Sequence, residues 1–165
     1  MLYFAYGSNL DPDQMRARCP AHRLVGAALL RDHKLIFPLF SNRWGGGAAS
    51  LQLSHGKDVW GVLYELTDED LQSLDLNEGF HGTGDARNLY ERESIWVELT
   101  RPEDGSVPRR VRAWTYLAHT ANPSLPSRRY MEAVIKGARA RRLPDDYLAA
   151  LTRLPVLAEE ATESE

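Results

Sequence analysis

Hydrophobic residues along the chain fall in short runs, and most of these runs have the length of a β-strand. Leu2 to Tyr6 is apolar and aromatic and stops at Gly7, which is typical of a buried strand that ends in a turn. Val59 to Leu66 is the strongest strand signal, because β-branched and aromatic residues dominate it. Further strands are predicted at residues 24–30, 35–37, 48–53, 89–100 and 107–118, the last two forming a hairpin around Asp104-Gly105.

Helices are predicted where a capping residue precedes apolar positions at helical spacing. Asp11 followed by Pro12 begins a short helix that ends near Cys19-Pro20. Thr67, with Asp70 three residues later, begins a second helix that carries Leu71 and Leu74. The remaining two are a helix capped by Ser127, with Tyr130, Val134 and Ala138 on one face, and a last helix within 144–154.

Strands and helices do not alternate regularly along this pattern. We therefore predict an α+β fold, with a small mixed, barrel-like β-sheet and peripheral helices. The length of 165 residues fits one domain, which we place at residues 1–157. Residues 158–165 are acidic and are expected to form a disordered tail.

Composition and charge limit the kinds of molecule that the protein is expected to bind and the compartment in which it is expected to act. The formal net charge is −3 and the basic residues are scattered, so nucleic acid is not an expected partner. No apolar run is long enough to span a bilayer, and the N-terminus lacks the basic region of a signal peptide. The single cysteine, Cys19, cannot build an internal disulfide framework, which favours the cytoplasm; we interpret it as a packed thiol.

The turn Tyr6-Gly7-Ser8-Asn9 is the first candidate for chemistry. Glycine lets a ligand approach the backbone, and successive N–H groups in a turn can bind an anion. The Ser8 hydroxyl and the Asn9 amide add donors. From these residues alone, an ordinary turn at the end of a strand is the more common interpretation.

Glu78 is the second candidate. Apolar neighbours on both sides can partly bury its carboxylate, and desolvation raises a carboxyl pKa towards the range useful for proton transfer. A solvated surface glutamate is the alternative. The five histidines show no metal-ligand spacing, so no metal site is predicted. The four tryptophans are expected to pack in the core, although Trp44 beside three glycines can also shape a pocket.

Several blocks of the chain together resemble the γ-glutamylcyclotransferase (AIG2-like) family. The match begins at Tyr3-Phe4-Ala5-Tyr6-Gly7-Ser8-Asn9-Leu10 and continues through Met15, Arg18-Cys19-Pro20 and Trp44-Gly45-Gly46-Gly47-Ala48. It resumes at Val59-Trp60-Gly61-Val62-Leu63-Tyr64, Leu74-Asp75 and Glu78-Gly79. It ends with Tyr90, Thr115-Tyr116, Tyr130, Gly137-Ala138 and Leu143-Pro144-Asp145-Asp146-Tyr147.

The resemblance implies an enzyme without a cofactor that converts a γ-glutamyl compound to 5-oxoproline and an amine or amino acid. The α-amine of the substrate attacks its own γ-carbonyl, and the catalytic glutamate of the family matches Glu78. A homodimer is also implied. The residues that would bind the γ-glutamyl head are Tyr3, Phe4, Ala5, Tyr6, Gly7, Ser8, Asn9, Tyr90 and Tyr116.

The group released from the substrate stays open at this stage. Residues 80–89 look longer than in the animal enzymes and are predicted to lie beside the pocket, where they can act as a lid. Two alternatives to cyclisation are a hydrolase of γ-glutamyl amides on the same fold and a binding protein without catalytic activity.

Overall fold

The structure is a computed structural model that describes residues 1–119 and 121–159. Within these residues a closed barrel is formed by strands in the order β1-β3-β2-β4-β5. The parallel pairing of Tyr3 in β1 with Trp114 in β5 closes it. The strands are β1 (Leu2–Ala5), β2 (Arg23–Ser41), β3 (Gly46–Glu65), β4 (Tyr90–Pro102) and β5 (Arg109–Ala118).

The long hairpin of β2 and β3 differs from the prediction, which divided it into four short strands. Its pairing continues through register shifts at Leu24/Gly26, Arg31/His33 and Ile36/Leu39. Such bulges bend a strand and increase its twist, so that one long hairpin can follow the curved wall of a barrel. The polar residues Arg31, Asp32 and His33 at the middle bulge interrupt the hydrophobic pattern without ending the strand.

Four α-helices lie within the described residues, close to the predicted positions. They are α1 (Pro12–Arg18), α2 (Asp68–Glu78), α3 (Arg128–Ala140) and α4 (Asp145–Thr152), and a 3₁₀ turn, η1 (Ser8–Leu10), follows β1. The predicted caps are confirmed, since Thr67 Oγ1 accepts a hydrogen bond from Asp70 N at 3.1 Å and Ser127 Oγ from Tyr130 N at 3.1 Å.

The end of α2 corrects one prediction. Residues 77–89 are polar and glycine-rich and have no periodicity, which predicts a loop. The helix instead continues through Glu78 and ends at Gly79, whose φ of 66° is left-handed. Glycine adopts this conformation at little cost, and the Gly79 N–H caps the carbonyl of Leu76. Glu78 therefore projects from a helix, which orients a side chain more firmly than a free loop does.

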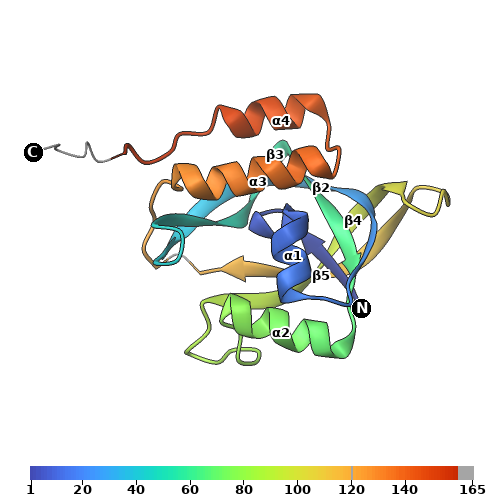
Figure 1. Cartoon of the computed structure of the whole chain (residues 1–165), viewed down its shortest axis with the longest axis horizontal. Coiled ribbons are helices and arrows are strands. Elements are labelled where there is room, and N and C mark those ends of the chain that lie inside the picture. The colour runs from blue at the N-terminus through green and yellow to red at the C-terminus, as the bar shows by residue number, and fades with distance from the viewer. Residues whose placement is uncertain (120, 160–165) are drawn as a thin grey trace, which may run out of the picture.

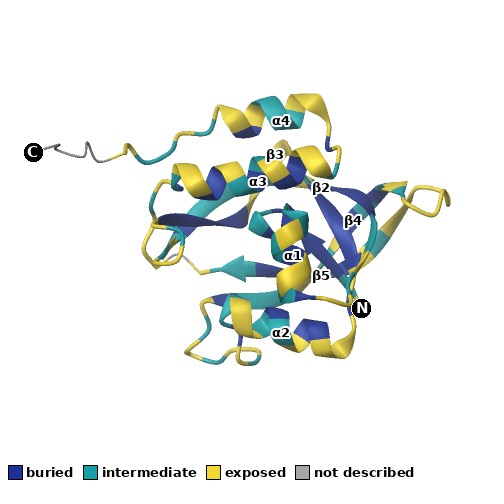
Figure 2. Cartoon of the chain, viewed as in Figure 1, coloured by how far each residue is buried: buried dark blue, intermediate teal, exposed yellow. Residues whose placement is uncertain are grey.

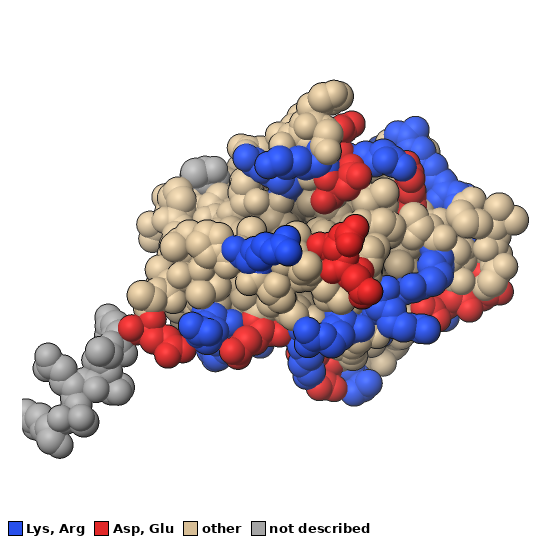
Figure 3. All heavy atoms as spheres, turned by 90° about the horizontal axis from the view of Figure 1, so that it is seen from above, with Lys and Arg blue, Asp and Glu red and all other residues tan. Residues whose placement is uncertain are grey.

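The helices lie on different sides of the barrel. Helices α3 and α4 run above it and α2 runs below it (Figure 1). Figure 2 shows that buried positions concentrate on the strands, whereas the outer faces of α2 and α4 are exposed. On the face that carries α3 and α4, basic and acidic side chains are interspersed (Figure 3). The α+β barrel with peripheral helices predicted from the sequence is thus confirmed.

Two smaller predictions have different outcomes. Trp96 was expected in the core but is 47% exposed, with the guanidinium groups of Arg110 and Arg112 lying 4.7 and 5.4 Å from its ring centre. The two cation–π contacts stabilise the ring at the surface, so the prediction that Trp96 packs in the core is wrong.

Of the predicted acidic tail, residues 160–165 lie outside the described residues.

Helix α3 fixes the 3₁₀ turn after β1 through a very close backbone approach. A Cβ atom placed on Gly137 would lie 2.3 Å from the carbonyl carbon of Leu10 and 2.3 Å from the amide nitrogen of Asp11. No side chain fits such a gap, so the contact depends on glycine.

We predict that Gly137→Ala destabilises the protein by about 1–3 kcal/mol through overpacking, although alanine favours a helix. Thermal or urea unfolding measures the change. Arg139→Ala, at an exposed position on the same helix, is the control and should differ from the parent by no more than about 0.5 kcal/mol. An unchanged or raised stability of Gly137→Ala would contradict the packing described here.

Candidate active site

A cavity of about 390 Å³ opens at one end of the barrel, where the turn after β1 meets the C-terminal end of α2. Residues from all five strands, from η1, α1, α2 and α3, and from the β2–β3 turn line it. Its lining residues are Tyr3, Tyr6, Gly7, Ser8, Asn9, Arg18, Leu39, Phe40, Ser41, Asn42, Arg43, Trp44, Ala48, Ala49, Asn77, Glu78, Leu89, Tyr90, Tyr116 and Tyr130.

Most residues proposed from the sequence meet at this cavity. Those that line it are Tyr3, Tyr6, Gly7, Ser8, Asn9, Glu78, Tyr90 and Tyr116. Phe4 and Ala5 do not line it, because both are fully buried in the core. The carbonyl of Phe4 instead accepts a hydrogen bond from Thr115 Oγ1 at 2.9 Å, which joins β1 to β5.

Glu78 points its carboxylate at two side chains of the N-terminal segment. Its Oε1 accepts a hydrogen bond from Asn9 Nδ2 at 3.2 Å and lies 3.7 Å from Arg18 Nη1. The Glu78 side chain is only 16% exposed. Burial raises its pKa, while Arg18, the Asn9 hydrogen bond and Arg43 oppose that rise. The carboxylate is thus desolvated enough to accept a proton and is still held in one place.

Asn9 is the centre of this arrangement. Its Nδ2 donates to Tyr3 Oη at 3.0 Å as well as to Glu78. Its Oδ1 accepts from Gln14 Nε2 at 2.9 Å and from Arg18 Nη1 at 3.0 Å. Two donors and two acceptor positions are all that an amide side chain has, so the orientation of Asn9 is fully determined. The amide therefore presents a fixed N–H to Glu78.

Tyrosines form much of the remaining wall. Tyr6 donates its hydroxyl proton to the carbonyl of Tyr116, and Tyr90 donates to the carbonyl of Ala49 at 2.9 Å. Tyr116 donates to Asp75 Oδ1 at 2.6 Å. Burial raises the pKa of Tyr6, Tyr90 and Tyr116, so each ring remains neutral and keeps its proton. The wall is rigid, aromatic and uncharged.

Several lining residues received no site role from the sequence, among them Arg18, Arg43 and Tyr130, and Trp44 was considered only as a residue that can shape a pocket. Arg18, Trp44 and Tyr130 lie in the blocks that carry the family resemblance, and that position was the signal available for them. Arg43 lies in the β2–β3 turn, outside those blocks, and reaches the cavity because this end of the long hairpin lies at it.

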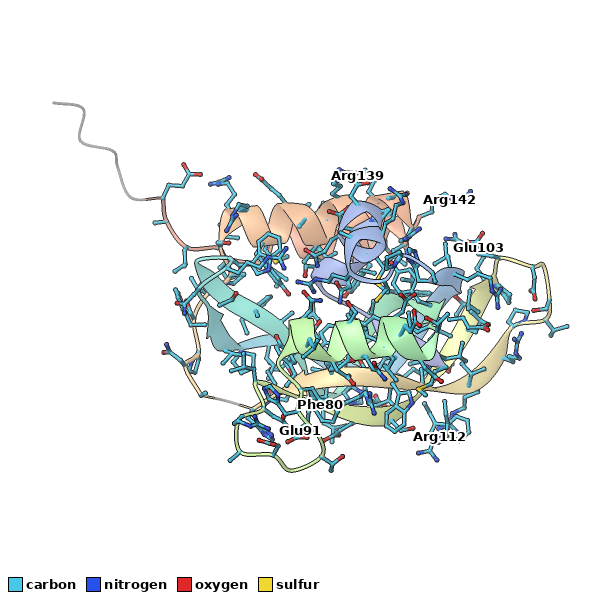
Figure 4. The ribbon with its side chains drawn as sticks, turned by 60° about the horizontal axis from the view of Figure 1, so that its bottom comes forward. Phe80, Glu91, Glu103, Arg112, Arg139 and Arg142 are labelled. Atoms are coloured by element: carbon cyan, nitrogen blue, oxygen red, sulfur yellow. The ribbon has the colours of Figure 1, made fainter. Side chains whose placement is uncertain are left out.

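The loop after Glu78 is braced by its own hydrogen bonds. His81 N donates to Asn88 Oδ1 at 2.6 Å, and Asn88 Nδ2 donates to the carbonyl of Gly82 at 2.7 Å. Figure 4 shows Phe80 and Glu91 at this loop, on the opposite side of the molecule from Arg139. Of the residues at 80–89, Leu89 lines the cavity. A lid role for the segment stays a prediction.

Other candidates do not join the site. Cys19 is buried, its thiol donates to the carbonyl of Asp70 at 3.4 Å, and burial raises its pKa to about 12, which agrees with the packed thiol predicted. Among residues 1–119 and 121–159, no three His, Cys, Asp or Glu side chains gather as a metal site would require. In the same part of the chain, no helix has the length and apolar character to cross a membrane.

Comparison with known proteins places this fold and cavity in a family. Residues 3–152 match the family model described as "Gamma-glutamyl cyclotransferase, AIG2-like". Curated proteins named gamma-glutamylcyclotransferase are similar to the chain: the human protein is 33% identical and the mouse protein 31% identical, each over 150 residues. These matches cover 88% of this chain and 74% of each relative.

A solved structure titled "Gamma-glutamyl cyclotransferase" superposes with a TM-score of 0.84 at 29% identity, covering all of this chain and 94% of the other. The chain belongs to the gamma-glutamyl cyclotransferase, AIG2-like family. It is an enzyme of the cyclotransferase class, as the sequence predicted.

We predict that Arg18→Gln raises the pKa of the Glu78 carboxyl further, because the arginine charge favours the carboxylate. An NMR titration of the glutamate side-chain carboxyl carbons measures this shift. Arg16→Gln, at an exposed position on the same helix, is the matched control and should leave the Glu78 titration in place. A pKa that falls or stays constant in Arg18→Gln would show that the ion pair does not tune Glu78.

Proposed function

We propose that the protein is a γ-glutamylcyclotransferase that releases 5-oxoproline, with Glu78 as general base and general acid. The observation that carries this proposal is the partly desolvated Glu78 carboxylate, held by Asn9 and facing a cavity large enough for a γ-glutamyl compound. The cyclotransferase family of the chain supports the reaction class.

The proposed reaction needs one group that moves a proton twice. The substrate α-amine is mostly protonated at neutral pH, because such amines have a pKa of about 8 or higher. Glu78 removes one proton from the ammonium, and the free amine attacks the γ-carbonyl and closes a five-membered ring. Glu78 gives this proton to the leaving nitrogen as the C–N bond of the γ-amide breaks. The carboxylate, ionised again, then takes the second proton from the ring nitrogen, and the released amine carries that proton away as an ammonium.

The turn after β1 supplies hydrogen-bond donors for the negatively charged groups of the substrate. In the described chain, the backbone N–H groups of Gly7 and Asn9 donate to no protein acceptor, and both residues line the cavity. They suit the substrate α-carboxylate or the oxyanion that develops on the γ-carbonyl, since each requires N–H donors. Ser8 adds its hydroxyl, to which Gln14 Nε2 donates at 2.7 Å.

The aromatic wall holds the glutamyl chain in the folded shape that cyclisation requires. Amine and carbonyl must approach to roughly 3–3.5 Å, and the neutral tyrosines Tyr3, Tyr90 and Tyr116 restrict an otherwise flexible chain. We propose that these three and the turn Tyr6-Gly7-Ser8-Asn9 bind the γ-glutamyl head. Phe4 and Ala5 support them from the core. A cytoplasmic location and a homodimer remain predictions.

Hydrolysis of the same amide is the alternative reaction, and it is distinguished by its product. In H₂¹⁸O, cyclisation produces 5-oxoproline without the heavy isotope, because the nucleophile is the amine of the substrate. Hydrolysis produces free glutamate that contains ¹⁸O. Mass spectrometry of products from several γ-glutamyl amino acids and amines separates the two, and no product from any of them would favour the binding-protein alternative.

Glu78→Gln should abolish most of the turnover, because the amide keeps the size of the side chain but cannot accept the ammonium proton. We predict a loss of about 10²- to 10⁴-fold in kcat with substrate binding retained. Steady-state kinetics of 5-oxoproline release and calorimetric binding measure the two effects. Glu69→Gln, exposed in the same helix, is the control. Turnover by Glu78→Gln at the parent rate would exclude Glu78 as the base.

The pH dependence of kcat/KM should follow the raised pKa of Glu78. The carboxylate is the active form, so kcat/KM falls as pH drops through this pKa, and the midpoint lies above the ordinary glutamate value of 4.5. Arg18→Gln should move the midpoint to higher pH. A midpoint at or below 4.5, or one that Arg18→Gln does not move, would contradict the electrostatic assignment.

A further inference from the structure

The rim of the cavity carries a cation to which the reaction described above assigns no contact with the substrate. Arg43 lies in the turn between β2 and β3, lines the cavity and is exposed to solvent. Asn9, at the inner end of the same cavity, is 3% exposed. The two residues therefore mark the outer and inner ends of the space that a substrate would fill.

The guanidinium of Arg43 has no acidic partner. Within residues 1–119 and 121–159 no ion pair and no side-chain hydrogen bond joins it to another residue, whereas Arg18 on the other side is bound to Asn9 and Glu78. Burial, followed by the charges of Arg18 and Arg129, lowers the pKa of Arg43, and the Glu78 carboxylate only partly offsets this effect. A ligand carboxylate that contacts the guanidinium directly can supply the charged partner that Arg43 lacks.

The turn that carries Arg43 is held in position from several sides. The guanidinium carbons of Arg43 and Arg129 lie 5.4 and 5.1 Å from the ring centre of Trp44. Arg129 also donates a hydrogen bond to the carbonyl of Arg43. Trp44 in turn packs edge-to-face on Tyr130, with ring centres 5.3 Å apart. A cation fixed in this way is pre-organised to bind a ligand.

The charge of the cavity distinguishes two classes of γ-glutamyl substrate. Two arginines, Arg18 and Arg43, and the ionised Glu78 leave one net positive charge among the lining residues. A γ-glutamyl derivative of a neutral amino acid has two carboxylates and one ammonium, so its net charge is negative. The γ-glutamyl amide of a simple amine has one of each and is neutral. The first class complements the cavity.

Resting on the proposed function, we propose that Arg43 is a specificity-determining residue that binds the carboxylate of the leaving amino acid. The α-amine of the glutamyl head must reach Glu78 at the inner end, so the leaving group points outward to the rim, where Arg43 lies. Arginine binds a carboxylate through two parallel N–H donors, which also orients the leaving nitrogen. Arg43 then sets how strongly a γ-glutamyl amino acid is favoured over a γ-glutamyl amine.

Two substrates that differ by one carboxylate test this assignment: γ-glutamyl-L-alanine and γ-glutamyl-ethylamide. We expect the parent enzyme to prefer the alanine compound by about 10- to 100-fold in kcat/KM, the range of a hydrogen-bonded charge pair. Arg43→Gln should remove this preference: at a pH well above the Glu78 midpoint, where Glu78 is ionised in both enzymes, kcat/KM falls for the alanine compound and changes little for the ethylamide. Arg43→Lys should restore part of it, since lysine keeps the charge without the paired donors. Arg16→Gln is the control.

Three results would overturn the inference. One is an equal loss on both substrates in Arg43→Gln, which would place Arg43 at the glutamyl head or in the support of the turn. A second is a parent enzyme with no preference for the alanine compound. In both cases 5-oxoproline still forms, so the proposed function stands. A third is the absence of 5-oxoproline from either substrate, which would contradict the proposed function as well.

Discussion

A hydrogen bond between residues 69 positions apart, Asn9 Nδ2 to Glu78 Oε1, joins the two parts of this site. Asn9 belongs to the turn after the first strand, and Glu78 is the last residue of α2. The geometry of both is determined by packing elsewhere: Gly137 lets α3 approach the turn, and Gly79 ends the helix directly after the carboxylate. The cavity exists because these two elements meet above the open end of the barrel.

Electrostatic balance then decides what the carboxylate can do. Burial alone favours protonated Glu78, whereas Arg18 and the Asn9 amide favour the ionised form. A general base must be ionised when substrate binds and must still accept a proton, so neither influence can dominate. The tyrosines around it contribute shape without charge, because burial keeps them protonated. Among the described residues that line the cavity, the charged ones are therefore Glu78, Arg18 and Arg43 at the rim.

Much of this structure was predictable from local signals in the sequence. Capping residues placed the starts of three helices, and the run Leu2 to Tyr6 with its following glycine placed the first strand. The continuity of β2 was not predictable, since the polar residues Arg31, Asp32 and His33 at its middle bulge look like the end of a strand. The helical position of Glu78 was also missed, because Asn77 and Glu78 have no apolar pattern. Arg43 was missed for a different reason, since its contact with the cavity depends on the folding of a hairpin about forty residues long.

The central claim is that Asn9 acts through Glu78, and a double-mutant cycle in kcat/KM tests it most directly. Asn9→Ala should lower kcat/KM by about 10- to 100-fold in the parent, the range for a hydrogen bond to a charged group. In the Glu78→Gln background it should lower kcat/KM by less than about threefold, because the carboxylate it positions is gone. Circular dichroism of all four proteins confirms that they are folded. Equal losses in the two backgrounds would show that Asn9 and Glu78 contribute independently, and would contradict the account.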